Sequence, residues 1–493
     1  MLSLLHTLRL DLDIHPPRSL RLALVGAGGK TTALFHLARE FVETPRRDVS
    51  SGRGVSTGSG ISIPPAVLVT TTTHLGLDQA DFADRHIIVH SPEQIDAVMD
   101  GSIEGVYLFT GAPDSQERLT GLSPELLERL RQLADERQLP LLIEADGARM
   151  LPLKAPGPHE PPIPDFVDVV VVVAGLSGLG KPLSDEWVHR PQAFASLSGL
   201  QLGQPVTAQG LVRELLHPQG GLKNIPAGAR RIALLNQAGT PELQSLAGSL
   251  VENLLSSYHT VIIADLAPLS PSLPASLAPS PLISNSYPLS PHPSPIHSAH
   301  ERIAAIILAA GESQRFGAPK PLLEWRGEPF VRHCIRAAQS AGLSPLLVVG
   351  GAHTRELRQA CAGFEVGLLH NSDWRAGQST SLQVGLRQLP AETGGAVFLL
   401  ADQPQVPPGL LRLLVETHAA GLPPIIAPMV DDRRANPVLF DRVTFPDLMA
   451  LQGDVGGRAV FSKYTLTWVP WHDRSILLDV DTPEDYQRLL NME

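Results

Sequence analysis

Short, continuous apolar runs alternate along the chain with longer stretches in which apolar residues recur every three or four positions. Continuous runs such as 167–175 (VDVVVVVAG) are typical of strands that are buried on both faces of a parallel sheet. In the first half of the chain, the helical spacing is carried by Leu34, Leu37, Ala38 and Phe41. In the second half, it is carried by Val331, Cys334, Ile335 and Ala338. Strands that alternate with amphipathic helices predict an α/β fold in both halves.

A segment of different composition separates the two halves. Residues 268–300 hold nine prolines and nine serines but no Lys, Arg, Asp or Glu. Proline removes backbone donors, so we expect this segment to be a linker without helix or sheet. The predicted organisation is an α/β domain over 1–266, a linker over 267–300 and a second α/β domain over 301–493. The Gly/Ser-rich residues 46–65 are predicted to form an enlarged surface loop.

The overall composition excludes several classes of protein. The formal net charge is −11, which leaves no basic footprint for nucleic acid. Only two cysteines are present, too few for a disulfide scaffold, and Cys334 lies in an apolar helical pattern that predicts a reduced core residue. The longest apolar run is too short to cross a bilayer, and the N-terminus does not resemble a signal peptide. We therefore expect a cytoplasmic protein with no membrane or nucleic-acid partner.

The second half carries a glycine-containing loop directly after an apolar strand. Residues 308–320 read LAAGESQRFGAPK, in which small residues leave backbone amides open to a ligand. Arg315 and Lys320 add the positive charge that a triphosphate and its leaving group need. A glycine-rich turn alone would be a weak signal, but the spacing L-A-A-G-x-S-x-R-x-G-x-x-K is more specific.

This spacing resembles the opening signature of the MobA-like nucleotidyltransferases, in particular the molybdenum cofactor cytidylyltransferases. The resemblance covers most of 303–490, because five further motifs follow in the family's order: 372–386, 399–404, 433–440, 453–458 and 479–486. It implies a Rossmann-like domain that transfers a nucleotidyl group and releases pyrophosphate. Positioning and charge neutralisation carry such a displacement.

The resemblance also implies roles for individual residues. The nucleotide would be bound by Leu308, Ala309, Ala310, Gly311 and Ser313. Arg315 and Lys320 would hold the triphosphate, and Asp402 and Asp481 would coordinate Mg²⁺. Taken alone, Asp402 is also consistent with the cap of a turn before Pro404, and Asp481 alone is better explained as the N-cap of a helix. The molybdopterin substrate would contact Arg434, Asn436 and Asp454, although Ala435 stands where the family usually has glycine.

Alanine at position 310 bears on the choice of base. The cytidylyltransferases resemble this chain in having alanine there, whereas the guanylyltransferases tend to have glycine. Ala310 therefore favours CTP, by the few kcal/mol at most that one methyl group provides.

The first half carries a different loop, GAGGKTT, at 26–32. It lacks the first glycine of a Walker A motif and is closer to the loop of Mur-type ligases. The start of a helix favours phosphate binding, so this is predicted to be a P-loop-like nucleotide-binding domain. The expected ligands are Gly26, Gly28, Gly29, Lys30, Thr31 and Thr32. Asp146, after the apolar strand 141–144, is the expected metal ligand, with Glu144 as the alternative. A degenerate loop that binds without hydrolysis is a further alternative.

Together with TTTTH at 70–74, LKAPGPHEPPIP at 153–164 and 178–194, this loop resembles the YqeC family over about 3–265. That family is described as accessory to selenium-dependent molybdenum hydroxylases. His74 and His159 are either ligands or polar residues that close strands, and Lys154 is either part of the site or a surface charge.

The two resemblances predict one function. We expect a cytidylyltransferase that joins CTP to molybdopterin, fused to a domain that binds ATP or GTP during the maturation of a molybdenum hydroxylase client. The alternatives are a nucleotidyltransferase for another phosphate, such as a sugar phosphate, and a carrier or chaperone for the cofactor. The first domain is alternatively a docking scaffold. The client, the oligomeric state and the involvement of selenium are left open.

Overall fold

The computed structural model describes residues 2–10, 19–43, 66–116, 118–268, 296–311, 316 and 318–492. The chain divides into two compact units, Met1–Ser298 and Ala299–Glu493. The predicted surface loop 46–65, most of the predicted linker, and Ser313 and Arg315 lie outside the described residues. Residues 296–300 lie within the predicted linker but form part of a strand, because they follow the last proline of that segment.

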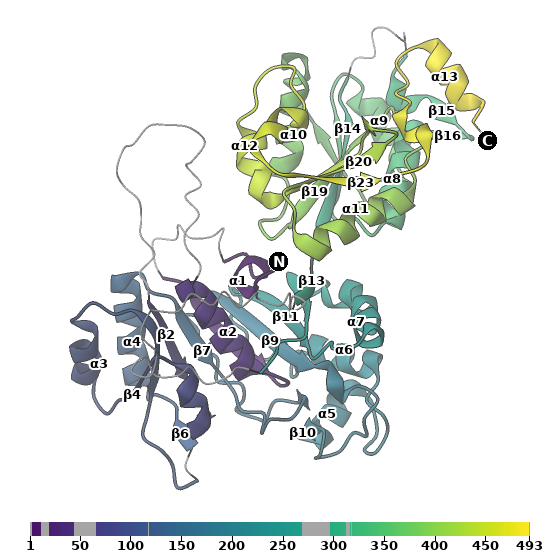
Figure 1. The fold of residues 1–493 in the computed structure, drawn as a ribbon. Coiled ribbons are helices and arrows are strands. Elements are labelled where there is room, and N and C mark those ends of the chain that lie inside the picture. The colour runs from purple at the N-terminus through teal and green to yellow at the C-terminus, as the bar shows by residue number, and fades with distance from the viewer. Residues whose placement is uncertain are drawn as a thin grey trace, which may run out of the picture. The chain divides into compact units, whose positions relative to one another are not determined.

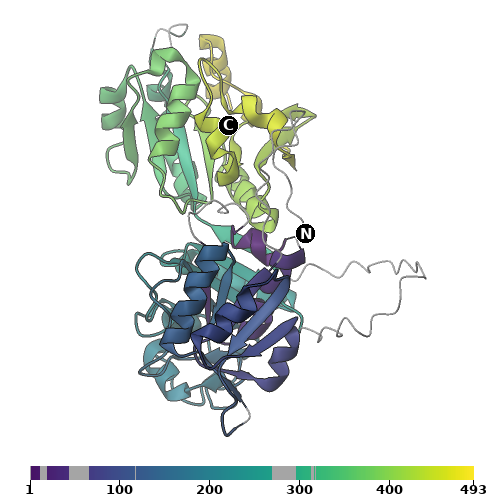
Figure 2. The same ribbon diagram turned by 90° about the vertical axis from the view of Figure 1, so that its left-hand side faces the viewer.

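The first unit is built on a nine-stranded sheet with helices on both faces (Figures 1 and 2). The strand order is β13 (Ile296–Glu301), β12 (Thr260–Ala264), β11 (Arg230–Asn236), β9 (Val169–Gly175), β1 (Arg21–Gly26), β7 (Leu141–Glu144), β2 (Ala66–Thr71), β5 (Gly105–Thr110) and β4 (Arg85–Ile88). The pairings from β4 to β12 are parallel. Parallel strands bring their carboxyl ends to one edge, where ligands bind in open α/β sheets.

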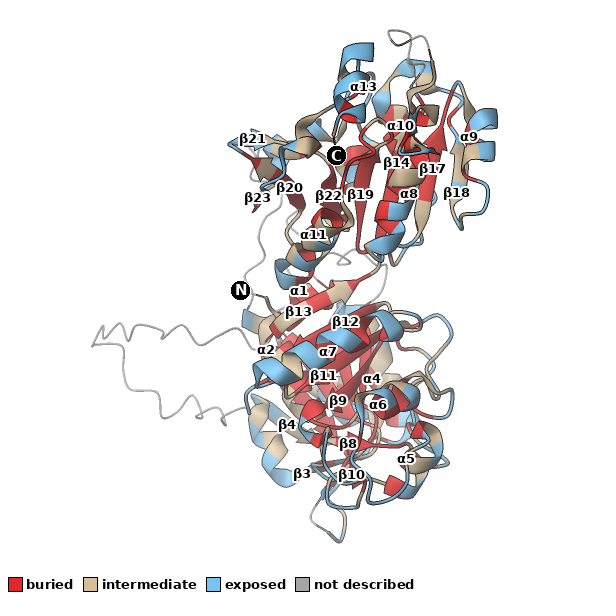
Figure 3. Cartoon of the chain, turned by 90° about the vertical axis from the view of Figure 1, so that its right-hand side faces the viewer, coloured by how far each residue is buried: buried red, intermediate tan, exposed pale blue. Residues whose placement is uncertain are grey.

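Every residue of β9 is buried, as the continuous apolar run predicts (Figure 3). One face of the sheet packs in a hydrophobic core with helices α3 (Pro92–Met99), α4 (Pro124–Arg137), α5 (Pro191–Ser198), α6 (Ala208–Leu216) and α7 (Pro241–Leu254). Helix α2 (Lys30–Glu43) packs on β1, β2, β5 and β7, and the short α1 (Leu4–Thr7) packs on α2. Two small sheets lie beside the main one: β3 (His74–Gly76) with β6 (Arg118–Thr120), and β8 (Leu153–Lys154) with β10 (Val188–His189).

The second unit has an eight-stranded mixed sheet. The strand order is β18 (Gly367–His370), β17 (Leu346–Gly350), β14 (Ile303–Ala309), β19 (Gly395–Leu400), β22 (Val438–Asp441), β20 (Ile425–Val430) and β21 (Arg433–Arg434), with β23 (Leu466–Pro470) also paired to β20. Strands β18 to β19 run parallel, whereas β22 is antiparallel to both of its neighbours.

Alternate residues of β14 enter two separate cores, one on each face of this sheet. Ile303, Ala305 and Ile307 pack with α8 (Phe330–Ser340), α9 (Thr354–Ala360) and α11 (Pro408–Gly421). Ala304 and Ile306 pack with α10 (Gln378–Arg387) and α12 (Phe445–Met449). A hairpin of β15 (Glu324–Trp325) and β16 (Glu328–Pro329) and the last helix α13 (Pro483–Leu490) complete the unit. The predicted α/β class is confirmed for both units.

The predicted helical face of α8 is confirmed. Its four members, including Cys334, are buried, and burial raises the pKa of the Cys334 thiol to about 12. Within the described part of the chain, we find no helix of the length and apolar character that a membrane span requires.

Candidate functional site

The second unit forms a cavity where β14 and its neighbour β19 end. β17 continues the sheet on one side of β14 and β19 on the other, so this is the point at which the strand order reverses. The cavity has a volume of about 350 Å³ and is lined by Leu308, Ala309, Ala310, Gly311, Lys320, Pro321, Trp374, Gly377, Gln378, Ser381, Leu400, Ala401, Asp402 and Asp454. Four of the predicted nucleotide ligands therefore lie together with Lys320 and Asp402.

Lys320 links two acidic residues from distant parts of the chain. Its Nζ atom lies 2.6 Å from Oδ1 of Asp481 and 3.6 Å from Oδ2 of Asp402. Asp481 is not the helix cap that we considered as an alternative, since Thr482 caps α13 by accepting a hydrogen bond from the Asp485 amide. The Asp481 side chain, 59% exposed, is therefore available to Lys320.

The carboxyl of Asp402 has a pKa raised to about 6, because burial disfavours its charge. Lys320 lowers this pKa, and the nearby charges of Asp479 and Asp481 raise it further. The pKa of Asp479 is raised by the same two causes, burial and Asp481. The site thus concentrates three carboxylates around one lysine, an arrangement that favours the binding of cations.

Asp479 is a site residue that the sequence analysis missed. Its carboxylate accepts a hydrogen bond from Nε2 of Gln403, which directly follows Asp402. The motif DVDT did contain a signal, because Asp479 and Asp481 are two positions apart, and alternate side chains of an extended segment point to the same side.

A second cavity of about 660 Å³ shares lining residues with the first. It holds all three predicted substrate contacts, Arg434, Asn436 and Asp454, and also Arg458 and Asp479. The Arg434 guanidinium lies 5.3 Å from the centre of the Phe461 ring. Burial, followed by the charge of Arg458, lowers the pKa of Arg434. Two neighbouring arginines favour an anionic ligand in this cavity.

The first unit places the loop GAGGKTT between β1 and α2. Gly26, Gly28 and Gly29 all have positive φ. A Cβ atom at Gly26 would lie 2.1 Å from the Val173 carbonyl oxygen, and one at Gly28 would lie 2.4 Å from Gly175. Gly26 and Gly28 are therefore required by the close packing of the loop against β9, whereas a Cβ atom at Gly29 would lie 2.4 Å from the Asn236 side chain of β11. The side chain of Asn236 also holds the loop, because its Nδ2 atom donates to the Gly28 carbonyl at 2.8 Å.

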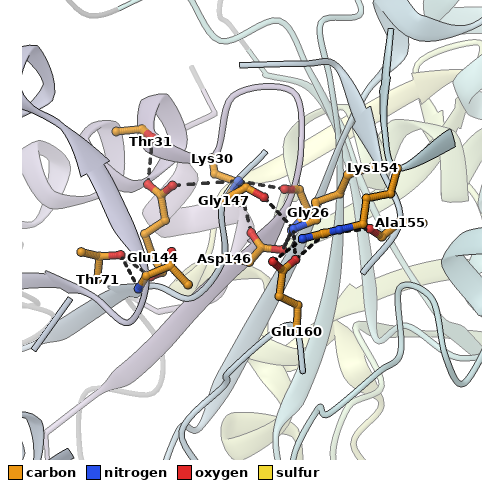
Figure 4. A network of polar contacts seen from close by, with 12 residues as sticks. Gly26, Lys30, Thr31, Thr71, Glu144, Asp146, Gly147, Lys154, Ala155 and Glu160 are labelled. Carbon is orange, nitrogen blue, oxygen red and sulfur yellow. Dashed lines mark hydrogen bonds and ion pairs between the residues drawn. The ribbon is translucent and has the colours of Figure 1, made fainter. Parts of the chain in front are cut away.

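Behind this loop lies a network of buried charges (Figure 4). Nζ of Lys30 donates to the Gly26 carbonyl at 2.8 Å and lies 3.2 Å from Asp146 and 3.9 Å from Glu144. Thr31 donates its hydroxyl hydrogen bond to Glu144 at 2.8 Å. Burial raises the pKa of Glu144, and Lys30 lowers it. Both candidate metal ligands thus lie beside Lys30, and Glu144 also contacts Thr31. That either of them binds a metal stays a prediction.

Lys154 extends the network, and the alternative of a surface charge is wrong. Its side chain is 3% exposed, and Nζ lies 2.8 Å from Asp146 and 3.0 Å from Glu160. Glu160 in turn is paired with Arg190 at 2.5 Å. Burial raises the pKa of Glu160, but Arg190 and Lys154 together lower it to about 2. No local pattern in the sequence indicates this chain of charges.

The loop opens on a cavity of about 1060 Å³. Gly28, Gly29, Lys30, Thr31, Thr32 and Glu144 line it, whereas Gly26 does not. His74 also lines it and lies 3.5 Å from Asp114, while His159 is exposed. The cavity is large enough for a small-molecule ligand. That this ligand is a nucleotide stays a prediction.

Comparison with known proteins agrees with the two resemblances. Residues 305–468 match the MobA-like NTP transferase domain, and 63–192 match the YqeC protein family. An uncharacterized protein of Escherichia coli, YqeC, is 34% identical over 217 residues, which cover 44% of this chain and 75% of the relative. The fusion of the two families, predicted from the motifs, is confirmed.

Two further relatives match the second unit. The purine catabolism protein PucB of Bacillus subtilis is 30% identical over 197 residues, which cover 37% of this chain and 94% of the relative. A probable molybdenum cofactor guanylyltransferase of Bacillus cereus is 42% identical over 53 residues, 11% of this chain and 26% of the relative. The chain thus spans about a quarter of the length of this last protein.

Proposed function

Since the chain belongs to the YqeC family and joins it to a MobA-like NTP transferase domain, we propose that it is a molybdenum cofactor cytidylyltransferase with a fused nucleotide-binding unit. The second unit is a nucleotidyltransferase domain. In the proposed reaction, CTP and molybdenum-loaded molybdopterin give the cytosine dinucleotide cofactor and pyrophosphate. The molybdenum assignment is supported by the relative named a molybdenum cofactor guanylyltransferase.

The observation that carries the proposal is the position of Lys320. Its ammonium lies between Asp402 and Asp481 in the cavity formed by Leu308–Gly311. A lysine beside small residues provides positive charge where a polyphosphate approaches the backbone. The second cavity, with Arg434 and Arg458, continues from the first and would take the anionic acceptor.

The chemical step is a displacement at phosphorus. An oxygen of the acceptor's phosphate attacks the α-phosphorus of CTP and forms a new P–O bond. The bond from the α-phosphorus to the oxygen that bridges to the β-phosphorus breaks, and pyrophosphate leaves with that electron pair. The attacking oxygen is already anionic, so the protein needs only to position the two substrates and to neutralise charge.

The residues present fit a divalent cation. Asp402, Asp479 and Asp481 supply oxygen donors alone, and the pKa of Asp402 is raised by burial first and then by the charges of Asp479 and Asp481. Oxygen donors with an excess of negative charge suit Mg²⁺. We propose that Asp402 and Asp481 hold this ion, with Asp479 beside them. When bound, the ion neutralises charge on the polyphosphate.

Ala310 supports CTP as the nucleotide. It is 8% exposed and lines the nucleotide cavity. Its methyl group occupies space that a glycine would leave to a larger base. In the first unit, we propose that Lys30 and Thr31 bind ATP or GTP with Mg²⁺ at Glu144 or Asp146, during the maturation of a molybdenum hydroxylase.

The proposal is tested by pyrophosphate release. Purified full-length protein is supplied with Mg²⁺, molybdenum-loaded molybdopterin, and CTP, GTP or ATP in separate reactions. We expect release with CTP, and its loss in Asp402→Ala. Release that requires a sugar phosphate in place of molybdopterin would favour another acceptor. Tight binding of the cofactor by folded protein with no release from any nucleotide would favour a carrier and contradict the proposal.

A further inference from the structure

In the first unit, we propose that Arg149 binds the terminal phosphate of a nucleoside triphosphate held at the glycine loop. This inference rests on the proposed nucleotide binding by that unit. It adds a specific role, the discrimination of triphosphate from diphosphate, for a residue that the motifs did not indicate.

Arg149 lies on a turn that is tied directly to the glycine loop. The turn follows β7 and the acidic pair Glu144 and Asp146. The Leu151 carbonyl at its end accepts a hydrogen bond from the Gly28 amide at 3.1 Å. At its start, the Gly147 carbonyl accepts a hydrogen bond from Nζ of Lys154 at 2.7 Å. Both ends of the turn are therefore fixed relative to the site, and Arg149 lines the same cavity as Lys30.

Arg149 differs from the other arginines of this cavity in its ion pairs. Arg118 lies 2.7 Å from Asp114, and Arg190 lies 2.5 Å from Glu160. Within the described ranges, the Arg149 guanidinium has no carboxylate or hydrogen-bond partner. Its guanidinium is thus available to an anion that enters the cavity. An arginine can donate two parallel hydrogen bonds to a phosphate, which makes it suited to this ligand.

Arg149 and Met150 are the central residues of a β-turn, which the Leu151 amide closes by donating to the Ala148 carbonyl at 3.0 Å. Arg149 and Met150 have φ angles of 50° and 59°. Left-handed conformations are costly for residues with a Cβ atom, here at two consecutive positions. Met150 is 96% exposed, so the burial of its side chain does not compensate for the strain. Such conformations cluster at ligand-binding sites, where the geometry of one side chain matters more than stability.

The test compares triphosphate and diphosphate binding in the full-length chain. ATP, ADP, GTP and GDP are titrated with Mg²⁺ by calorimetry. Binding that is lost in Lys30→Ala but kept in Lys320→Ala belongs to the first unit. We expect Arg149→Ala to weaken the triphosphate about 10- to 100-fold, as for the loss of a charge-assisted contact, and the diphosphate less than about threefold. Arg149→Lys should retain part of the difference.

The matched control is Arg137→Ala, an exposed arginine of the same unit that lies outside the cavity. It should bind all four nucleotides as the unmodified protein does. Equal weakening of triphosphate and diphosphate in Arg149→Ala, or no weakening of either, would overturn the role of Arg149 while nucleotide binding stands. If no nucleotide shows Lys30-dependent binding to folded protein, the nucleotide site itself is wrong, and the role of Arg149 is overturned with it.

Discussion

The ammonium of Lys320 lies 2.6 Å from Oδ1 of Asp481, a residue 161 positions away in the sequence. The same ammonium lies 3.6 Å from Asp402, at the end of β19. This relationship brings the first, third and last motifs of the nucleotidyltransferase domain into one site. Motifs that are separate along the chain therefore meet in the folded unit.

We predict that Lys320→Ala reduces pyrophosphate release at least about 100-fold, because an electrostatic contact to the reacting group is worth roughly 2.7–4 kcal/mol. Lys320→Arg should recover part of the rate, since it keeps the charge. Arg336→Ala is the control, because that exposed arginine pairs with Glu328 at 2.7 Å and does not line the cavity. Equal rates in Lys320→Ala and the control would contradict the catalytic position of Lys320.

Substitution of Gly311 and of Gly28 by alanine should have different effects on folding. Among the described residues, none lies within 4 Å of a Cβ atom built at Gly311, so Gly311→Ala should fold normally but place a methyl group in the nucleotide cavity. Gly28→Ala should instead destabilise the first unit, because its φ is +85° and the new Cβ would lie 2.4 Å from Gly175. Thermal unfolding and nucleotide titration of both variants separate these effects. Normal nucleotide binding by Gly311→Ala would show that the space beside it is not used.

Replacing Lys154, one of two buried lysines in the charge network of the first unit, should strongly destabilise that unit. Lys154→Met leaves the Asp146 carboxylate, 2% exposed, without one of its two cations. Breaking a buried ion pair costs about 3–5 kcal/mol. Arg129→Met breaks an ion pair with Asp96 that solvent screens, and it should destabilise the unit much less. Both free energies are measured by denaturant unfolding, and similar losses for the two variants would contradict the role of Lys154 in stability.

The stability of the first unit should depend on the titration of Glu214. Burial raises the pKa of this carboxyl from 4.5 to about 8. Between these pH values the folded state binds more protons than the unfolded state, so stability falls as pH rises, by at most about 1.4 kcal/mol per pH unit. Glu214→Gln removes this slope. It should therefore be more stable than the unmodified protein at pH 8, with a smaller difference at pH 5. If the unfolding temperatures of Glu214→Gln and the unmodified protein change with pH in parallel, the contribution of Glu214 is contradicted.

The sequence predicted those parts of the site that local motifs carry. The order of six motifs placed Lys320, Asp402 and Asp481 in one site, and the strand and helix patterns gave both α/β units. Asp479 was missed because its importance depends on burial beside Asp402 and on a hydrogen bond from Gln403. Neither of these features is visible in local composition.

In the first unit, the sequence could not predict the charge network. Lys154, Glu160 and Arg190 are separated by up to 36 positions and show no periodicity, yet the pairing of β8 with β10 brings them together. The glycines of the loop were interpreted as phosphate ligands, whereas Gly26 is explained by its contact with β9. The charge network and the requirement for glycine at position 26 both result from burial and long-range strand pairing, which exist only in the completed fold.

The central claim is cytidylyl transfer to molybdopterin, and the identity of the product tests it most directly. Full-length protein is incubated with Mg²⁺, molybdenum-loaded molybdopterin and equal concentrations of CTP and GTP, and the products are separated by mass spectrometry. We predict a cofactor that carries cytidine monophosphate, absent with Asp402→Ala and shifted towards guanosine monophosphate with Ala310→Gly. A guanosine-containing product from the unmodified protein, or no nucleotide-containing cofactor at all, would contradict the account.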